Sequence, residues 1–313
     1  MNRVVHLDVR STETVRTKVR FPSGDTECVA WHYPGTNGAC VIMAGGFGVT
    51  KEPGTDRFAA RFHQAGFSVL AFDYRHLGES GGRPRQVLRV AEQLADWDAA
   101  IAYAKTLPEA APNRLIAWGF SATGGYLFQV AARHSELAGA IAQTPTADGA
   151  AATRNAARFQ SPLALLKTTG LSLLDTVCGW FGRSPILVPL AGPPGSVAML
   201  TMPDALRGQE ALQADRYPEW VQAVAARSLI GLSRYRPGRD AARIGCPLLV
   251  VVAESDQAAL VEPSVRAAQR APRGRLLRIP GGHYEPFLGS HETVVDAELA
   301  FLREVSGVSG EAA

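Results

Sequence analysis

One serine with small neighbours is the first candidate for chemistry in this chain of 313 residues. The segment LIAWGFSATGGYLF, residues 115–128, runs from an apolar stretch into a Gly-x-Ser step. A serine hydroxyl is a poor nucleophile until a base takes its proton, and a sharp strand-to-helix turn exposes it to such a base. Because Gly119, Gly124 and Gly125 flank Ser121, we expect a nucleophile at such a turn. A helix N-cap is the structural alternative for this serine.

The motif GFSATGG resembles the nucleophile elbow of the α/β-hydrolase superfamily. It departs from G-x-S-x-G because Thr123 takes the place of the last glycine. It is closer to the G-x-S-x-[ST]-G-G form of a bacterial esterase and thioesterase-like branch. The resemblance spans roughly residues 21–302, is least specific over the middle of the chain, and implies that Ser121 is the nucleophile of a serine hydrolase.

The segment MAGGFGVTKE is similar to the H-G-F-G segment of the same superfamily, which completes the oxyanion hole. The resemblance implies that the backbone N–H groups of Phe47 and Ala122 are the two oxyanion donors. Gly45 stands where the family usually has histidine, a change that removes no donor but predicts a looser loop. A plain glycine-rich turn is the alternative. A Walker-type phosphate loop is excluded, because the G-K-[ST] ending is missing.

The resemblance also implies an acid and a base. VVAESDQAALVEP places Asp256 just after an expected strand, and LLRIPGGHYEPF places His283 just after the last expected strand. The order Ser121, Asp256, His283 is the order of the α/β hydrolases. A second candidate for the acid is Asp148, which follows the serine by 148 − 121 = 27 residues. A solvated loop position is the alternative for Asp256.

Further residues are candidates for scaffolding or substrate contact. The segment FDYRHLGESGG matches a family segment whose residues are mainly structural, so Asp73 and Arg75 are assigned to loop scaffolding. His76 ends an expected strand near the mouth of the pocket. The candidate substrate-binding residues are His76, Trp180, Phe181 and Tyr284.

Six near-continuous apolar runs predict strands that are covered on both faces in a parallel sheet. They span residues 40–46, 68–74, 115–120, 139–145, 247–255 and 275–280. Two earlier segments, around 15–21 and 28–33, alternate more and predict an antiparallel hairpin at the edge. Helical patterns lie between most runs, as over 55–65 and 87–106. The predicted fold class is therefore α/β, a doubly wound, mostly parallel sheet of about eight strands.

This alternation stops between residues 146 and 243, where no strand is required. We expect a helical cap (lid) insertion over the carboxyl edge of an α/β-hydrolase core formed by residues 1–145 and 244–313. An enlarged crossover with two helices is the alternative. If the apolar residues of this region face the cleft, we expect a bulky and hydrophobic substrate. Alternatively, these residues pack against one another within the cap or form a homodimer contact. These residues are Leu163, Leu165, Leu166, Leu171, Leu173, Leu174, Trp180, Phe181, Ile186, Leu187 and Val188.

The composition argues against several classes of protein. The net charge is 32 − 29 = +3 with scattered arginines, so nucleic acid is not an expected partner. The four cysteines lack the close spacing of a metal or redox motif, and we expect free thiols, no metal and no cofactor. The first 20 residues have no apolar core, and the run at 247–253 is too short to cross a membrane. We expect a cytoplasmic protein without a membrane partner.

These observations predict an enzyme that cleaves a carboxylic ester or thioester through an acyl-serine intermediate. The expected substrate is a hydrophobic small molecule or acyl chain. One alternative is an acyltransferase or cyclase, and another is a C–C bond hydrolase or lyase of natural-product metabolism, both with the same triad. A third is a non-catalytic binding protein with the α/β-hydrolase fold. Fold by itself does not distinguish these functions.

Overall fold

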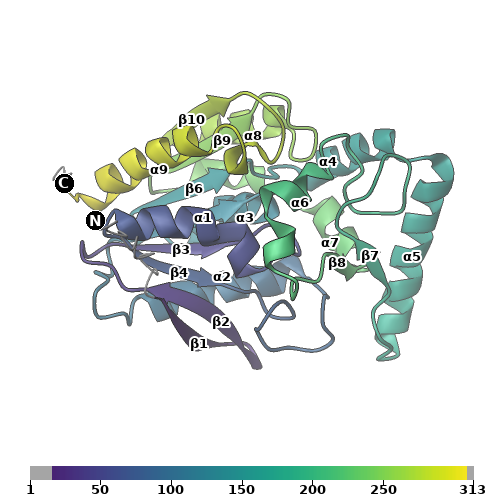
Figure 1. The fold of residues 1–313 in the computed structure, drawn as a ribbon, viewed down its shortest axis with the longest axis horizontal. Helices are drawn as coiled ribbons and strands as arrows, with labels where there is room; N and C mark the ends of the chain where they lie inside the picture. Colours follow the sequence, from purple (N-terminus) through teal and green to yellow (C-terminus); the bar gives the residue numbers. More distant parts are fainter. Residues whose placement is uncertain (1–15, 309–313) are drawn as a thin grey trace, which may run out of the picture.

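The computed structural model describes residues 16–308, and an eight-stranded sheet forms its centre (Figure 1). The strand order is β1-β2-β4-β3-β5-β6-β9-β10. β2 pairs antiparallel with β1 and β4, and the strands from β4 to β10 run parallel. The predicted edge hairpin is confirmed, although Val15 lies outside the described residues. The strands are β1 Thr17–Ser23, β2 Thr26–Tyr33, β3 Cys40–Ala44, β4 Ser68–Phe72, β5 Leu115–Phe120, β6 Gly139–Gln143, β9 Leu248–Ala253 and β10 Gly274–Ile279.

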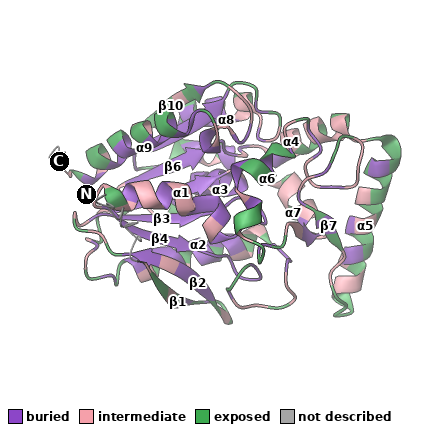
Figure 2. Ribbon diagram, in the orientation of Figure 1, coloured by how far each residue is buried: buried purple, intermediate pink, exposed green. Residues whose placement is uncertain are grey.

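The middle of the sheet is buried on both faces (Figure 2). Every residue of β3, β4, β5, β6 and β9 is buried, whereas β1 and β10 at the two edges are largely exposed. Strands covered on both faces need apolar residues at every position, which is why their sequences are continuous apolar runs. The predicted doubly wound α/β fold is confirmed.

Two helical layers cover the sheet (Figure 1). Helices α1 (Lys51–Gln64) and α9 (His291–Ser306) lie on one face, and α2 (Val90–Ala104), α3 (Ala122–Arg133) and α8 (Val261–Arg270) lie on the other. The helices expected at 55–65 and 87–106 are present with shifted ends. Phe58 of α1 packs on Trp118 of β5 at 5.2 Å between ring centroids and on Phe287 at 5.3 Å. This aromatic cluster anchors α1, and with it the loop that precedes α1.

The segment between β6 and β9 lies beyond the sheet (Figure 1). It contains α4 (Gly149–Ala156), α5 (Pro162–Trp180), α6 (Arg207–Ala211) and α7 (Ser228–Arg234). The prediction that it needs no strand is wrong, because β7 (Leu187–Pro189) and β8 (Ala223–Ala225) pair antiparallel. Strands of three residues are too short to show a period of two, so the sequence carried no signal for them.

Candidate active site

Ser121 lies at a strained turn between β5 and α3. Its backbone has φ 59° and ψ −123°, which is rare for a residue with a side chain. Its N–H donates to the Gln143 carbonyl at 2.9 Å, and its carbonyl accepts from the N–H groups of Gly125 and Thr146 at 3.0 Å each. A Cβ on Gly125 would lie 2.4 Å from the Thr146 carbonyl oxygen, so the close approach requires glycine there. The small residues after the serine therefore serve to hold the turn.

The three residues predicted as a triad are in hydrogen-bond contact. His283 Nε2 lies 2.9 Å from Ser121 Oγ, and His283 Nδ1 lies 2.8 Å from Asp256 Oδ2. The other oxygen of Asp256 accepts from the N–H groups of Ala258 and Ala259 at 2.8 Å each. Because an ionised carboxylate only accepts, Nδ1 carries the imidazole proton and Nε2 is left to accept from the serine hydroxyl. This arrangement matches the geometry needed for a serine nucleophile with a general base.

The alternatives for Ser121 and for the acid do not match this geometry. Ser121 occupies the N-cap position of α3, but its side chain makes no capping hydrogen bond. Asp148 is the N-cap of α4, and its Oδ1 accepts from the Ala151 N–H at 2.9 Å. The carboxylate that faces His283 Nδ1 is Asp256.

Two carboxylates control the charge of His283, which is 1% exposed. Burial by itself lowers the pKa of this imidazole, because it penalises the charged form. Asp256, and more weakly Asp204, favour the protonated ring, and the net pKa lies above the ordinary histidine value. The histidine is thus a stronger base than a free imidazole.

The predicted oxyanion donors lie beside the serine. Phe47 and Ala122 line the same cavity as Ser121, and a Cβ on Gly46 would be 3.3 Å from Ser121 Cβ. Within the described chain, neither the Phe47 N–H nor the Ala122 N–H donates a hydrogen bond to another residue. Two unpaired N–H groups beside the serine can receive the negative charge of a tetrahedral intermediate.

Residues 36–288 match the family model described as serine aminopeptidase, S33. The chain belongs to this family of α/β hydrolases. It is 38% identical over 293 residues to the quorum-quenching protein AidA of Acinetobacter baumannii (strain MDR-ZJ06), covering 92% of this chain and 94% of AidA. It is 27% identical over 188 residues to the thiohydrolase apmlB of Arthrinium phaeospermum, covering 60% of this chain and 59% of apmlB. The fold is similar to that of the α/β hydrolase GrgF from Penicillium sp. sh18, with a TM-score of 0.79, 22% identity, and coverage of 94% of this chain and 99% of GrgF.

Gly45 was predicted to loosen the loop between β3 and α1, which carries Phe47 and is called the oxyanion loop below. In this α/β hydrolase the loop is instead held by hydrogen bonds. Thr123 Oγ1 donates to the Gly45 carbonyl at 2.5 Å and lies 2.9 Å from the Tyr74 hydroxyl, which in turn accepts from Trp97 Nε1 at 2.7 Å. Since Thr123 gives its proton to Gly45, Tyr74 must donate to Thr123. A Cβ at position 45 would lie 2.9 Å from the Val49 carbonyl oxygen, so a histidine has no room there. The threonine that departs from the family motif therefore ties the nucleophile helix to the loop that carries Phe47.

The predicted scaffolding residues also hold the loops near the site. The Asp73 carboxylate accepts from the Lys51 N–H at 2.7 Å, from Lys51 Nζ at 2.9 Å and from the Glu79 N–H at 3.1 Å. Arg75 Nε donates to Asp96 at 2.8 Å. The Asp73 bonds join the start of α1 to the loop after β4, and the Arg75 bond joins that loop to α2, so both residues fix the loops next to the one that carries Phe47.

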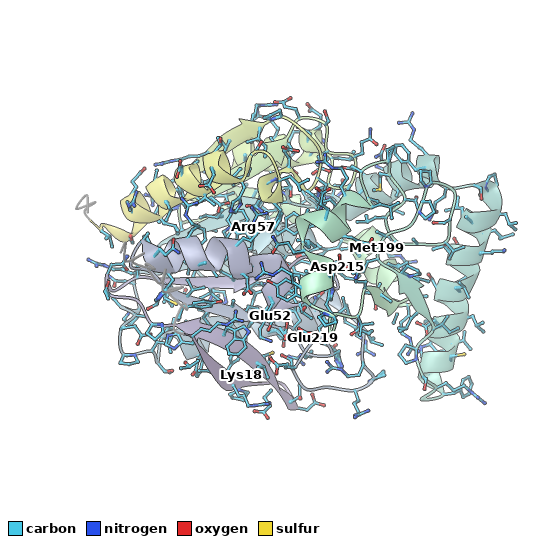
Figure 3. All side chains as sticks on the ribbon, in the orientation of Figure 1. Lys18, Glu52, Arg57, Met199, Asp215 and Glu219 are labelled. Carbon is cyan, nitrogen blue, oxygen red and sulfur yellow. The ribbon has the colours of Figure 1, made fainter. Side chains whose placement is uncertain are left out.

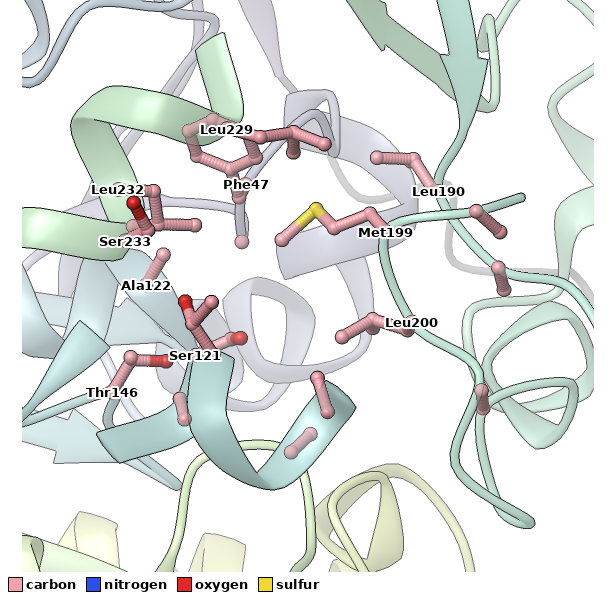
Figure 4. A pocket seen from close by; sticks show the side chains of 18 of the residues that line it. Phe47, Ser121, Ala122, Thr146, Leu190, Met199, Leu200, Leu229, Leu232 and Ser233 are labelled. Carbon is pink, nitrogen blue, oxygen red and sulfur yellow. The ribbon is translucent and has the colours of Figure 1, made fainter. Parts of the chain in front are cut away.

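Ser121 lines a cavity of about 400 Å³. Residues at the edge of the sheet and residues of the inserted segment between β6 and β9 form its walls. Phe47 and Ala122 come from the sheet side, whereas Met199 and Leu200 come from the inserted segment (Figure 4). Met199 lies where the inserted segment meets the sheet (Figure 3). The single charged side chain among the described lining residues is Arg234, which is exposed. Other apolar lining residues are Val49, Leu165, Leu173, Leu190, Leu212, Leu229, Ile230 and Leu232.

Only one of the four candidate substrate-binding residues lies at the cavity. Tyr284 lines the cavity, but His76, Trp180 and Phe181 do not. His76 is buried in the loop after β4, and its Nε2 lies 3.3 Å from Glu92. Trp180 and Phe181 are each 77% exposed, because the end of α5 points them away from the cavity. Trp180 and Phe181 were predicted to contact the substrate, but they lie on a side of the segment that does not face the cavity.

Two site residues were missed by the sequence analysis, and both belong to the inserted segment. Trp220 Nε1 donates to the Gly48 carbonyl at 2.8 Å, next to the predicted oxyanion donor Phe47. Asp204 Oδ2 accepts from the His283 N–H at 3.0 Å. Both lie in irregular stretches without periodicity, so no signal was available for them.

Among residues 16–308, no cluster of three or more histidine, cysteine, aspartate or glutamate side chains could hold a metal ion. None of the helices described is long and apolar enough to cross a membrane. The cytoplasmic location and the absence of a nucleic-acid partner stay predictions.

Proposed function

We propose that this α/β hydrolase is a serine hydrolase that cleaves an ester or thioester of an apolar acyl group through an acyl-serine intermediate. The observation that carries the proposal is the hydrogen-bonded chain from Ser121 through His283 to Asp256, which opens into an apolar cavity. Distances of 2.8–2.9 Å along the chain allow proton transfer without rearrangement.

The proposed reaction has two halves. His283 takes the proton of Ser121 as Oγ attacks the carbonyl carbon, and the oxyanion is held by the N–H groups of Phe47 and Ala122. The imidazolium is stabilised by Asp256, and it then gives its proton to the leaving alkoxide or thiolate. Water repeats these steps to release the acid and restore the serine. Each N–H donor contributes roughly 2.7–4 kcal/mol to transition-state stabilisation in comparable sites.

The cavity supports an uncharged, apolar acyl group as the substrate. Its lining is mostly aliphatic and aromatic, and its one charged side chain among the described residues, Arg234, is exposed, so a carboxylate or phosphate placed among the aliphatic side chains would lose hydration. The thiohydrolase relative supports a thioester as one substrate type, and the name of the relative AidA supports quorum quenching as a biological role. We therefore propose small acyl esters and acyl thioesters as the substrates to test.

We also propose that residues 146–243 form a cap on a core made of residues 1–145 and 244–313. The support is that the inserted segment supplies the cavity wall opposite Ser121 and contacts both the oxyanion loop and the histidine loop. Such a cover would exclude water from the acyl-enzyme, which is the condition under which an alcohol or amine competes as acceptor.

Active-site labelling tests the proposal. The wild-type protein and Ser121→Ala would be treated with a fluorophosphonate and analysed by intact-mass spectrometry. We expect one adduct on the wild type and none on the variant. A well-folded wild type that takes up no label, and hydrolyses neither p-nitrophenyl esters nor acyl thioesters, would favour a binding protein. Product analysis with and without added alcohol then separates hydrolysis from acyl transfer.

A further inference from the structure

Helix α5 is attached to the rest of the protein along one side only. Of its 19 residues, Ala164, Ser172 and Asp175 are buried. Asp175 is the main anchor, because its carboxylate accepts from Arg227 Nε and Nη2 at 2.8 Å each and from the Ile186 N–H at 2.7 Å. The side of α5 opposite these buried residues is therefore exposed to solvent.

That face is apolar. We define the outer α5 face as Leu163, Leu166, Gly170, Leu174 and Val177, whose spacings of three and four residues place them on one side of the helix. The four side chains are 60%, 70%, 52% and 43% exposed, in chain order. Trp180 and Phe181, each 77% exposed, extend the face at its carboxyl end. It lies at the outer edge of the molecule, opposite the side of α5 that faces the cavity (Figure 2).

The outer α5 face has twofold internal symmetry about Gly170. Leu166 and Leu174 are each four residues from Gly170, and Leu163 and Val177 are each seven residues away. If a second α5 lay antiparallel across the first at Gly170, Leu166 would therefore meet the partner's Leu174, and Leu163 would meet the partner's Val177. An isologous dimer contact needs this kind of self-complementary pattern.

None of the described residues 16–308 requires a glycine at position 170. A Cβ built on it would meet nothing within 4 Å. Glycine inside a helix costs roughly 0.5–1 kcal/mol relative to alanine, so its presence at the middle of an exposed apolar face calls for a cause. The missing Cβ lets the axis of a second helix come close at this point.

The size and charge of the face also favour a second copy. The exposed parts of its side chains, with Trp180 and Phe181, amount to an area on the order of 600–700 Å² if each offers about 150–200 Å² when fully exposed. That area approaches the roughly 800 Å² that each partner typically buries in a stable interface, and it lies above the roughly 300–600 Å² of the largest patch on a typical monomer. The antiparallel arrangement separates the two Lys167 ammonium groups and opposes the two helix dipoles, whereas a parallel one would place both lysines together.

We propose that the outer α5 face is the contact between two copies of this chain, with the two α5 helices crossing antiparallel at Gly170. This inference is independent of the proposed reaction. The opposite side of α5 contributes Leu165, Thr168 and Ser172 to the cavity, so the dimer would also hold one wall of the cavity in place.

Sedimentation equilibrium on the full chain at 1–100 μM tests the proposal (roughly the range over which such interfaces assemble). We expect a dimer for the wild type and a monomer with unchanged circular dichroism for Leu166→Glu/Leu174→Glu. The dissociation constant of the double variant should rise about 1000-fold or more, because carboxylates would be buried against leucines. Leu206→Glu is the matched control, since Leu206 is 46% exposed and lies outside α5, and it should stay dimeric.

Cysteine cross-linking tests the geometry. In a Cys178→Ser background, Gly170→Cys should form a disulfide-linked dimer on mild oxidation, because like residues meet at the twofold axis. Lys167→Cys should not, because the two positions would be six residues apart along the axis, about 9 Å, which is beyond the reach of a disulfide. A monomeric wild type at 100 μM, a dimeric double variant, or cross-linking at Lys167→Cys alone would overturn the proposal. Co-sedimentation of a monomeric wild type with phosphatidylcholine vesicles would assign the face to a lipid surface instead.

Discussion

The hydroxyl of Thr123 offers the sharpest test of how the oxyanion loop is held. Thr123→Val keeps the shape of the side chain and removes only the hydroxyl. The Gly45 carbonyl then loses a donor at 2.5 Å, and the Tyr74 hydroxyl loses its acceptor at 2.9 Å. Thr123 is 0% exposed and Tyr74 is 1% exposed, and Gly45 is buried, so water cannot replace either bond.

The expected magnitude follows from these two lost bonds. Each buried polar group left unpaired costs about 1–3 kcal/mol, so the loss of two partners should lower the free energy of unfolding by about 2–6 kcal/mol. Complete loss of one oxyanion donor typically costs 10²–10³-fold in kcat. The loop keeps its bonds from the Val49 N–H to the Gly46 carbonyl and from Trp220 to the Gly48 carbonyl. We therefore expect a smaller fall in kcat, roughly 10–100-fold.

Urea unfolding followed by circular dichroism gives the stability, and hydrolysis of p-nitrophenyl butyrate gives kcat. Thr123→Ser is the matched control: it keeps the hydroxyl, loses one methyl group worth about 1 kcal/mol, and should retain most activity. A double-mutant cycle with Tyr74→Phe should show a coupling of about 1 kcal/mol, since the two residues share one bond. If Thr123→Val loses no more stability than Thr123→Ser, the hydroxyl contributes no more than one methyl group, which would contradict the expected loss of about 2–6 kcal/mol. An unchanged kcat in Thr123→Val would show that the link does not position the loop.

Three other predictions concern the base, the acid and the cavity. Asp256→Asn should lower kcat by roughly 10⁴-fold, because the imidazole loses the carboxylate that fixes its tautomer, whereas Asp148→Asn should lower it less than threefold; the reverse ranking would contradict the assignment of the acid. Asp204→Asn should move the acidic limb of the kcat/KM profile to lower pH, because the charge of Asp204 raises the pKa of His283 and only the neutral imidazole acts as base; an unmoved limb would mean that Asp204 acts only as a hydrogen-bond acceptor. Met199→Trp should lower kcat/KM for p-nitrophenyl octanoate at least 10-fold more than for the acetate, because the indole narrows the cavity; an equal effect on both esters would place Met199 outside the acyl path.

The sheet could be predicted because each central strand lies under helices on both sides. A run such as Leu248–Ala253 must then be apolar at every position, and the sequence shows this directly. The pair β7 and β8 could not be predicted, because three residues are fewer than two periods of a strand. The burial of Glu298 could not be predicted either. A glutamate in a helix predicts a surface position, yet Glu298 is buried and accepts from Trp118 Nε1 at 3.0 Å.

The residues brought together at the site could be placed from the sequence because each follows the end of a strand. In a parallel sheet the carboxyl ends meet at one edge, so Ser121, Asp256 and His283 converge whatever the loops between them do. Residues of the inserted segment have no such rule. The apolar residues of α5 predicted burial in general, but only the rotation of the helix decides that Leu165 lines the cavity while Leu166 is 70% exposed.

The inserted segment contacts both the loop of the proposed oxyanion donor and the loop of the proposed base. Trp220 holds the Gly48 carbonyl beside the oxyanion donor Phe47, and Asp204 holds the backbone of His283. A displacement of this segment would therefore release the loop of the oxyanion donor and the loop of the base together, besides opening the cavity. With the proposed mechanism, the position of the segment would set the reactivity of Ser121 as well as its access to substrate, so we expect substitutions at Asp204 or Trp220 to change kcat more than KM.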